Sequence, residues 1–116
     1  MESIQDLTPE KRKHTRIDLE TQVSIRSIYF ASRMIGWIED ISRGGFKVRA
    51  GIPLNFIGLF NEGDPVFFET HEDFFKLRGK GRIQWTSTEK GEAGIKFDEL
   101  EYKSRKSLEE FLRMFA

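Results

Sequence analysis

The sequence predicts a mainly β fold: a small six-stranded antiparallel β-barrel with a C-terminal amphipathic helix packed on it. Two observations predict this fold class. Several short segments alternate apolar and polar residues and are separated by clusters of turn-forming residues. The chain then changes to helical periodicity, since Leu108, Phe111, Leu112 and Phe115 recur at the spacing of one helix face. Short strands followed by a single helix are typical of a small closed sheet with the helix on its surface.

The first strand is expected to carry Val23 and Ile25 on its buried face. Its alternation changes phase afterwards, which indicates a bulge or a turn near Ser27. The apolar segment 51–63 contains a proline and three glycines but no clean period, so we expect a loop packed over the core. The expected strands cover residues 20–30, 34–41, 45–50, 66–70 and 75–85, with a last strand around Ala93, Ile95 and Phe97.

The segment 75–85 alternates most regularly of all. Phe75 and Trp85 are expected on its buried face, and the opposite face is expected to be wet and basic. The helix is expected over residues 102–115, with Ser104 or Ser107 as its N-cap. The basic positions of the strand are Lys76, Arg78, Lys80 and Arg82.

Length and composition indicate one globular domain. The chain has 116 residues, of which 38% are hydrophobic and 33% charged. No apolar run approaches the roughly 20 residues of a membrane span. Because the sequence contains no cysteine and starts without a secretory signal pattern, we expect a cytoplasmic protein without disulfides. We expect residues 1–10 to form a flexible N-terminal tail and residues 11–116 a single domain.

Net charge narrows the range of partners. The chain carries 19 basic and 19 acidic residues, whereas a general nucleic-acid-coating protein is more often net basic. The neutral sum nevertheless hides a local basic cluster, the segment 11–16 just before the first expected strand. A local basic cluster in a neutral protein favours a small anionic ligand over a long polyanion.

Two short motifs carry the functional signal. Asp40, Ser42 and Gly45 lie in a polar turn between two expected strands, where Asp and Ser side chains can hydrogen-bond the local backbone. Arg12 and Arg16 lie four residues apart in the basic cluster. Together these residues resemble the RxxxR and [D/N]xSxxG motifs of the PilZ domain family, in the order and separation that the family has. The resemblance extends from about residue 11 to the C-terminus.

The resemblance implies a receptor for the bacterial second messenger cyclic di-GMP and, again, a six-stranded barrel with a C-terminal helix. The motif arginines would bind phosphate and the Hoogsteen edge of guanine, and Asp40 would accept hydrogen bonds from guanine N1–H and N2–H₂. Ser42 would supply a hydroxyl, and Gly45 would let the backbone approach the ligand. The implied ligand-binding residues are Arg12, Arg16, Asp40, Ser42 and Gly45, with Lys11, Arg43 and Gly44 as secondary contacts.

Three other functions compete with this one. A PilZ-shaped protein-protein adaptor that binds no nucleotide is the nearest alternative, although such members usually lack the motif arginines. A small single-stranded nucleic-acid-binding barrel would use the basic face of residues 75–85, but the aromatic residues of that segment are expected on the other face. We expect no enzyme, no catalytic residue and no metal site: the two histidines are far apart, and residues 71–73 are expected to form an ordinary turn.

The expected mechanism is an order transition. Ligand phosphates would draw the segment carrying Arg12 and Arg16 over the barrel, and an effector protein would recognise the changed surface. The family resemblance implies a role in motility, biofilm formation or exopolysaccharide control. Phe56, Ile57, Leu59 and Phe60 would allow a homodimer or a partner contact if they were exposed, although burial in the core is the simpler expectation.

Overall fold

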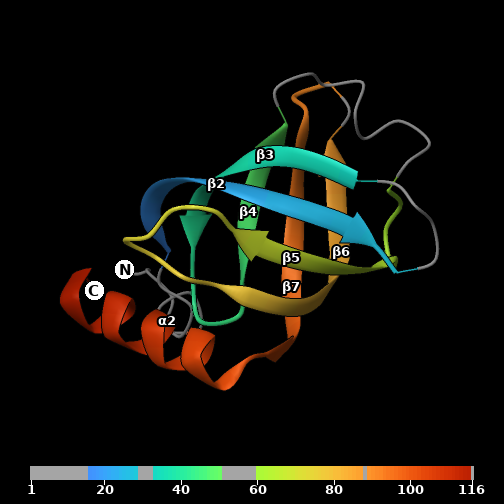
Figure 1. Cartoon of the computed structure of the whole chain (residues 1–116). Coiled ribbons are helices and arrows are strands. Elements are labelled where there is room, and N and C mark those ends of the chain that lie inside the picture. The colour runs from blue at the N-terminus through green and yellow to red at the C-terminus, as the bar shows by residue number, and fades with distance from the viewer. Residues whose placement is uncertain (1–15, 29–32, 51–59, 88, 116) are drawn as a thin grey trace, which may run out of the picture.

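The computed structural model describes residues 16–28, 33–50, 60–87 and 89–115. Within these residues, six antiparallel strands close into a barrel in the order β2-β3-β4-β7-β6-β5, and one helix follows the last strand (Figure 1). The predicted fold class is therefore confirmed. The elements are β2 (Ile17–Ser27), β3 (Arg33–Ile41), β4 (Gly45–Ala50), β5 (Pro65–Thr70), β6 (Arg78–Ser87), β7 (Glu92–Leu100) and α2 (Tyr102–Phe115).

The core fills the barrel and continues under the helix. The rings of Phe46 and Phe68 meet edge to face inside the barrel, with centroids 5.2 Å apart. Helix α2 lies along one end of the barrel (Figure 1) and buries Leu108 and Leu112, two residues of the predicted apolar face. Each large apolar side chain buried in this way contributes about 1.5–3 kcal/mol relative to full exposure. The barrel is thus a rigid support for the turns at its ends.

The first strand differs from its prediction. Strand β2 begins at Ile17, and its bulge lies between Asp18 and Thr21. Of the bulge or turn predicted near Ser27, the turn is correct, because Ser27 pairs with Val66 as the last residue of the strand and the chain bends at Ile28. Residues 29 and 30, which the prediction included, lie outside the described residues.

The segment 75–85 buries Phe75, Leu77 and Ile83 on the predicted side, but the strand starts later. Phe75 and Leu77 are each 1% exposed. Strand β6 nevertheless begins at Arg78, because Thr70 holds the preceding backbone. Its hydroxyl donates to the Phe75 carbonyl at 2.8 Å and accepts from the Leu77 N–H at 2.9 Å. The alternation therefore predicts the burial of Phe75 and Leu77 correctly, although both residues lie in the connection before β6 and not in a strand.

The helix has its predicted bounds, but the predicted caps are wrong. Ser104 and Ser107 both lie inside α2, which begins at Tyr102. The buried Ser104 hydroxyl accepts a hydrogen bond at 2.8 Å from the backbone N–H of Arg78, so it fixes the helix to the start of β6. Among the described residues, no helix is long and apolar enough to cross a membrane.

Of the loop predicted over residues 51–63, the structure describes residues 60–63. Residues 51–59, including Phe56, Ile57 and Leu59, lie outside the described residues, as do the N-terminal tail and the segment 11–15. Phe60 is 1% exposed and belongs to the core, which excludes it from an exposed patch.

Candidate functional site

The turn between β3 and β4 carries the second motif and is tightly held. The Ser42 backbone N–H donates to the Gly45 carbonyl at 2.8 Å, and the Ser42 hydroxyl accepts from the Gly44 N–H at 3.3 Å. The Gly44 carbonyl accepts from Phe97 of β7 at 2.9 Å. Ser42 is only 3% exposed. Its side chain therefore shapes the turn, and the turn presents a fixed backbone surface at the end of the barrel.

Gly45 is required by the neighbouring strand. An ideal Cβ at this position would lie 2.0 Å from the carbonyl oxygen of Ile95 on β7. Neither Gly44 nor Gly45 has a positive φ, so backbone conformation does not demand glycine at either position. The motif glycine thus allows two strands to approach closely, which is a structural reason that the sequence alone did not indicate.

Asp40 and Arg16 meet across β2 and β3. The Arg16 guanidinium donates to Asp40 Oδ1 at 2.7 Å, and the side chains are 55% and 15% exposed respectively. The second carboxylate oxygen of Asp40 lies 3.8 Å from the ammonium of Lys47 on β4. One residue of each motif is therefore in direct contact, and a further cation supports the aspartate. Arg12 and Lys11 lie outside the described residues.

Lys47 connects this pair to a larger network of charges. Its ammonium lies 3.5 Å from Glu39, and Glu39 also accepts a hydrogen bond from Arg49 at 2.7 Å. Partial burial acts to raise the pKa of Glu39, but the hydrogen bond from Arg49 and the charge of Lys47 outweigh it, so this pKa lies below its usual value of 4.5. Glu39 is held as a carboxylate, and it binds both Arg49 and the Lys47 that lies beside Asp40.

A cavity of about 610 Å³ opens beside the turn, and we call it the motif cavity. It brings together Arg16, Asp40, Ser42 and Gly45, four of the five predicted binding residues. Arg43, a predicted secondary contact, points elsewhere and pairs with Glu109 of α2 at 3.2 Å. The complete lining is Arg16, Asp40, Ser42, Gly44, Gly45, Phe46, Lys47, Gln84, Trp85, Gly94, Ile95 and Lys96.

Trp85 was missed by the sequence prediction, which put it on the buried face. The register of β6 and β7 shifts between Ile83 and Trp85, so the alternation of β6 is broken there. The indole is partly exposed and lines the motif cavity. It lies over Gly94, where an ideal Cβ would be 2.1 Å from Trp85 Nε1. The expectation that Trp85 is buried was wrong, and no periodicity in the sequence indicates the register shift beside it.

The other candidate clusters of the sequence have local partners. On β6, Arg78, Lys80 and Arg82 pair with carboxylates of residues 98–101 at 3.2–3.5 Å. His71 hydrogen-bonds Ser24 of β2, and Glu72 accepts from Thr21 at 3.0 Å. The basic face of β6 is thus largely neutralised by the protein itself.

A family model for the PilZ domain matches residues 10–114. The chain belongs to the PilZ domain family. Its PilZ fold is also found in three solved structures of low identity. The PilZ domain of CeSA from a cellulose-synthesizing bacterium has a TM-score of 0.65 at 20% identity, over 86% of this chain and 96% of that one. The Escherichia coli YcgR PilZ domain, solved with cyclic di-GMP, has a TM-score of 0.70 at 12% identity, over 90% and 91%.

The third structure is the Bacillus subtilis inhibitor of motility MotI/DgrA. It has a TM-score of 0.64 at 16% identity and covers 89% of this chain, which in turn spans 50% of that protein. Comparison with curated proteins found no match. At these identities, the structural likeness establishes the PilZ fold.

Proposed function

We propose that this PilZ domain is a receptor for cyclic di-GMP and binds it in the motif cavity. The observation that carries the proposal is the convergence of Arg16, Asp40 and Trp85 on one cavity beside a rigid backbone turn. Each of these side chains suits a different part of the ligand: a cation for phosphate, an acceptor for the guanine edge, and an aromatic face for the base.

The charge of the motif cavity supports the same ligand. Its charged lining consists of Arg16, Lys47, Lys96 and Asp40, a net charge of +2. Cyclic di-GMP carries two phosphodiester groups and hence two negative charges. The proposed complex therefore compensates the net charge of the lining.

Binding requires the pair of Arg16 and Asp40 to separate or to rearrange. The pair is largely exposed on the arginine side, and ion pairs of this kind stabilise a fold by only about 0–1 kcal/mol. A bidentate arginine contact to guanine O6 and N7 contributes about 1–3 kcal/mol. Such a contact offsets the loss of the ion pair, and Lys47 remains beside Asp40 when Arg16 turns to the ligand.

The proposal also assigns a role in binding to Arg12 and Lys11. As residues of the first motif and its flank, they would close over the bound nucleotide, with Gly44 in the cavity lining. The ordering of this segment would create the surface that an effector protein recognises. If amide exchange of residues 8–18 stayed the same at saturating ligand, the ordering mechanism would be wrong.

Calorimetric titration with cyclic di-GMP tests the proposal. The wild type is expected to bind, and Arg12→Ala with Arg16→Ala is expected to weaken binding by roughly 100-fold or more, because each lost contact costs on the order of 10- to 100-fold. Arg105→Ala with Arg113→Ala, which removes the same charge from exposed positions of α2, is the matched control and should bind like the wild type. Wild-type protein that releases no heat and shows no binding in a second assay would contradict the proposal.

The adaptor alternative predicts that negative result, and partner searches would then replace ligand assays. A nucleic-acid-binding barrel is disfavoured because the cations of β6 are paired with carboxylates of β7 and of residue 101. The proposed receptor is not an enzyme. It acts in the cytoplasm through protein contacts, in motility, biofilm or exopolysaccharide control.

A further inference from the structure

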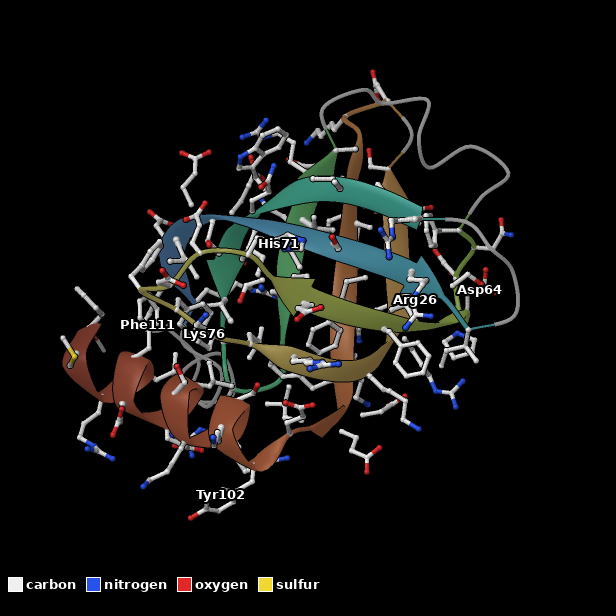
Figure 2. The ribbon with its side chains drawn as sticks, in the orientation of Figure 1. Arg26, Asp64, His71, Lys76, Tyr102 and Phe111 are labelled. Atoms are coloured by element: carbon white, nitrogen blue, oxygen red, sulfur yellow. The ribbon has the colours of Figure 1, made fainter. Side chains whose placement is uncertain are left out.

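A second groove lies on the outer wall of the barrel, formed by β2, β3, β5, β6 and β7, and we call it the wall groove. It has a volume of about 440 Å³, within the usual range of small-ligand sites. None of its lining residues lines the motif cavity. Arg26 and His71, both labelled in Figure 2, belong to its wall. The wall groove is therefore independent of the proposed nucleotide site.

A continuous cross-strand row forms the floor of the wall groove. Arg33 of β3 pairs in register with Arg26 of β2, Arg26 with Phe67 of β5, Phe67 with Lys80 of β6, and Lys80 with Glu99 of β7. Residues directly opposite each other in an antiparallel sheet point to the same face, so these five side chains share the outer surface. Arg26 and Arg33 lie directly opposite each other, and like charges in this position repel and destabilise the sheet when no anion is bound.

Among the residues that the structure describes, some cations of the wall groove have carboxylate partners and others have none. Lys80 pairs with Glu99 at 3.5 Å, and Arg78 pairs with Glu101 at 3.5 Å. Arg26 and Arg33 have no ion pair with any residue of the described part of the chain. The uncompensated charge of the groove is thus concentrated on two neighbouring guanidinium groups.

The ring of Phe67 orients the guanidinium group of Arg26. The Arg26 guanidinium carbon lies 4.8 Å from the centre of the Phe67 ring. A guanidinium stacked on an aromatic ring keeps the N–H groups of its edge available for an acceptor. Arg26 is therefore positioned to donate, together with Arg33, to an oxyanion placed between them.

The balance of charge indicates which anion fits. Four cationic side chains and three carboxylates (those of Glu69, Glu99 and Glu101) line the wall groove, a net charge of +1. A single carboxylate compensates this charge and matches the guanidinium geometry. A phosphate dianion or a nucleic acid would bring more charge than the groove can compensate and would meet the three carboxylates. We propose that the wall groove is a second binding site, which takes a carboxylate group between Arg26 and Arg33.

The carboxylate has two sources that share this chemistry: a free organic acid, or an acidic side chain of a peptide. The test is a ¹H–¹⁵N NMR titration of the full chain at constant ionic strength, with benzoate in one arm and acetyl-Gly-Glu-Gly-amide in the other. Saturable shifts of the Arg26, Phe67 and Lys80 amides are expected in at least one arm, and the arm that binds more tightly identifies the source. The neutral acetyl-Gly-Gln-Gly-amide and inorganic phosphate are expected to bind at least tenfold more weakly.

Variants separate a site from a general charge effect. Arg26→Gln with Arg33→Gln should weaken carboxylate binding at least tenfold, whereas Arg105→Gln with Lys106→Gln, which removes the same charge from exposed positions of α2, should leave it unchanged. Arg33→Gln alone should melt at or above the wild-type temperature, because it relieves the repulsion. No saturable shift in the wall groove, tighter binding of phosphate, or an equal loss in the control variant would overturn the proposal.

Discussion

Gly45→Ala should unfold this PilZ domain more easily even when no ligand is present. The added Cβ would lie 2.0 Å from the carbonyl oxygen of Ile95 and 3.1 Å from Cα of Lys96. Both neighbours are backbone atoms of β7, so no side-chain rotation can relieve the contact. Because real Cβ contacts below 3.0 Å are essentially never seen, β7 would have to retreat from β4 by about 1 Å.

The magnitude follows from what this retreat disturbs. Overpacking of a close contact costs about 1–3 kcal/mol. The retreat also weakens the hydrogen bond between Phe97 N–H and the Gly44 carbonyl, which adds about 0.5–1.5 kcal/mol. The free energy of unfolding should therefore fall by about 1.5–4.5 kcal/mol. At about 4 °C per kcal/mol for a domain of this size, Tm falls by roughly 6–18 °C.

Thermal unfolding followed by circular dichroism, without ligand, measures this change. Lys47→Ala is the matched control on the same strand, because it removes only partly exposed ion pairs and should change stability by less than about 1 kcal/mol. If Gly45→Ala melted within roughly 2 °C of the wild type, the close approach of β4 and β7 would not be the reason for the glycine. The motif glycine would then have to be explained by ligand contact, as the family resemblance implies.

Three further predictions concern the cavity and the charge network. Gly94→Ala would place a Cβ 2.1 Å from Nε1 of Trp85 and displace the indole. Calorimetry should then show that cyclic di-GMP binding is weakened by about 1–3 kcal/mol, the contribution of one base stacked on an aromatic side chain. Unchanged affinity would exclude stacking on Trp85. The lowered pKa of Glu39 means that its carboxylate stabilises the fold at pH values above 4.5 and loses this effect as the pH falls through the lower folded-state pKa. Glu39→Gln should therefore destabilise the fold at pH 7 and approach the wild type in strongly acidic buffer, and a pH-independent difference in urea unfolding would contradict the assignment. Because the basic face of β6 is neutralised by carboxylates, fluorescence anisotropy should detect no binding of a single-stranded oligonucleotide at about 0.15 M salt, and clear binding would revive the nucleic-acid alternative.

Much of the fold follows from the sequence because burial determines its periodicity. The strand over residues 45–50 and the helix over residues 102–115 have their predicted bounds, since each presents one continuous apolar face to the same core. The start of β6 was misplaced because Phe75 and Leu77 are buried without belonging to a strand. Periodicity records which side chains are buried, whereas strand bounds depend on backbone partners such as the Thr70 hydroxyl.

For the candidate binding site, the sequence predicts only the residues that belong to the two short motifs. Arg16 and Asp40 could be paired with the ligand by resemblance, but their direct contact depends on the register of β2 and β3. Lys96 and Trp85 are distant in sequence from both motifs and reach the motif cavity through the pairing of β6 with β7. The register shift before Trp85 and the position of Gly94 under its indole depend on how β6 pairs with β7, and no local sequence pattern predicts that pairing.

The most direct test of the account follows the two indole N–H signals in ¹H–¹⁵N spectra during titration with cyclic di-GMP. The Trp37→Phe variant assigns them, because it leaves only Trp85. The account predicts saturable shifts of the Trp85 indole and of the amides of Arg16 and residues 40–45, while the Trp37 indole stays in place. Spectra that remain unchanged, or that change saturably only outside the motif cavity, would contradict the claim that this PilZ domain binds cyclic di-GMP there.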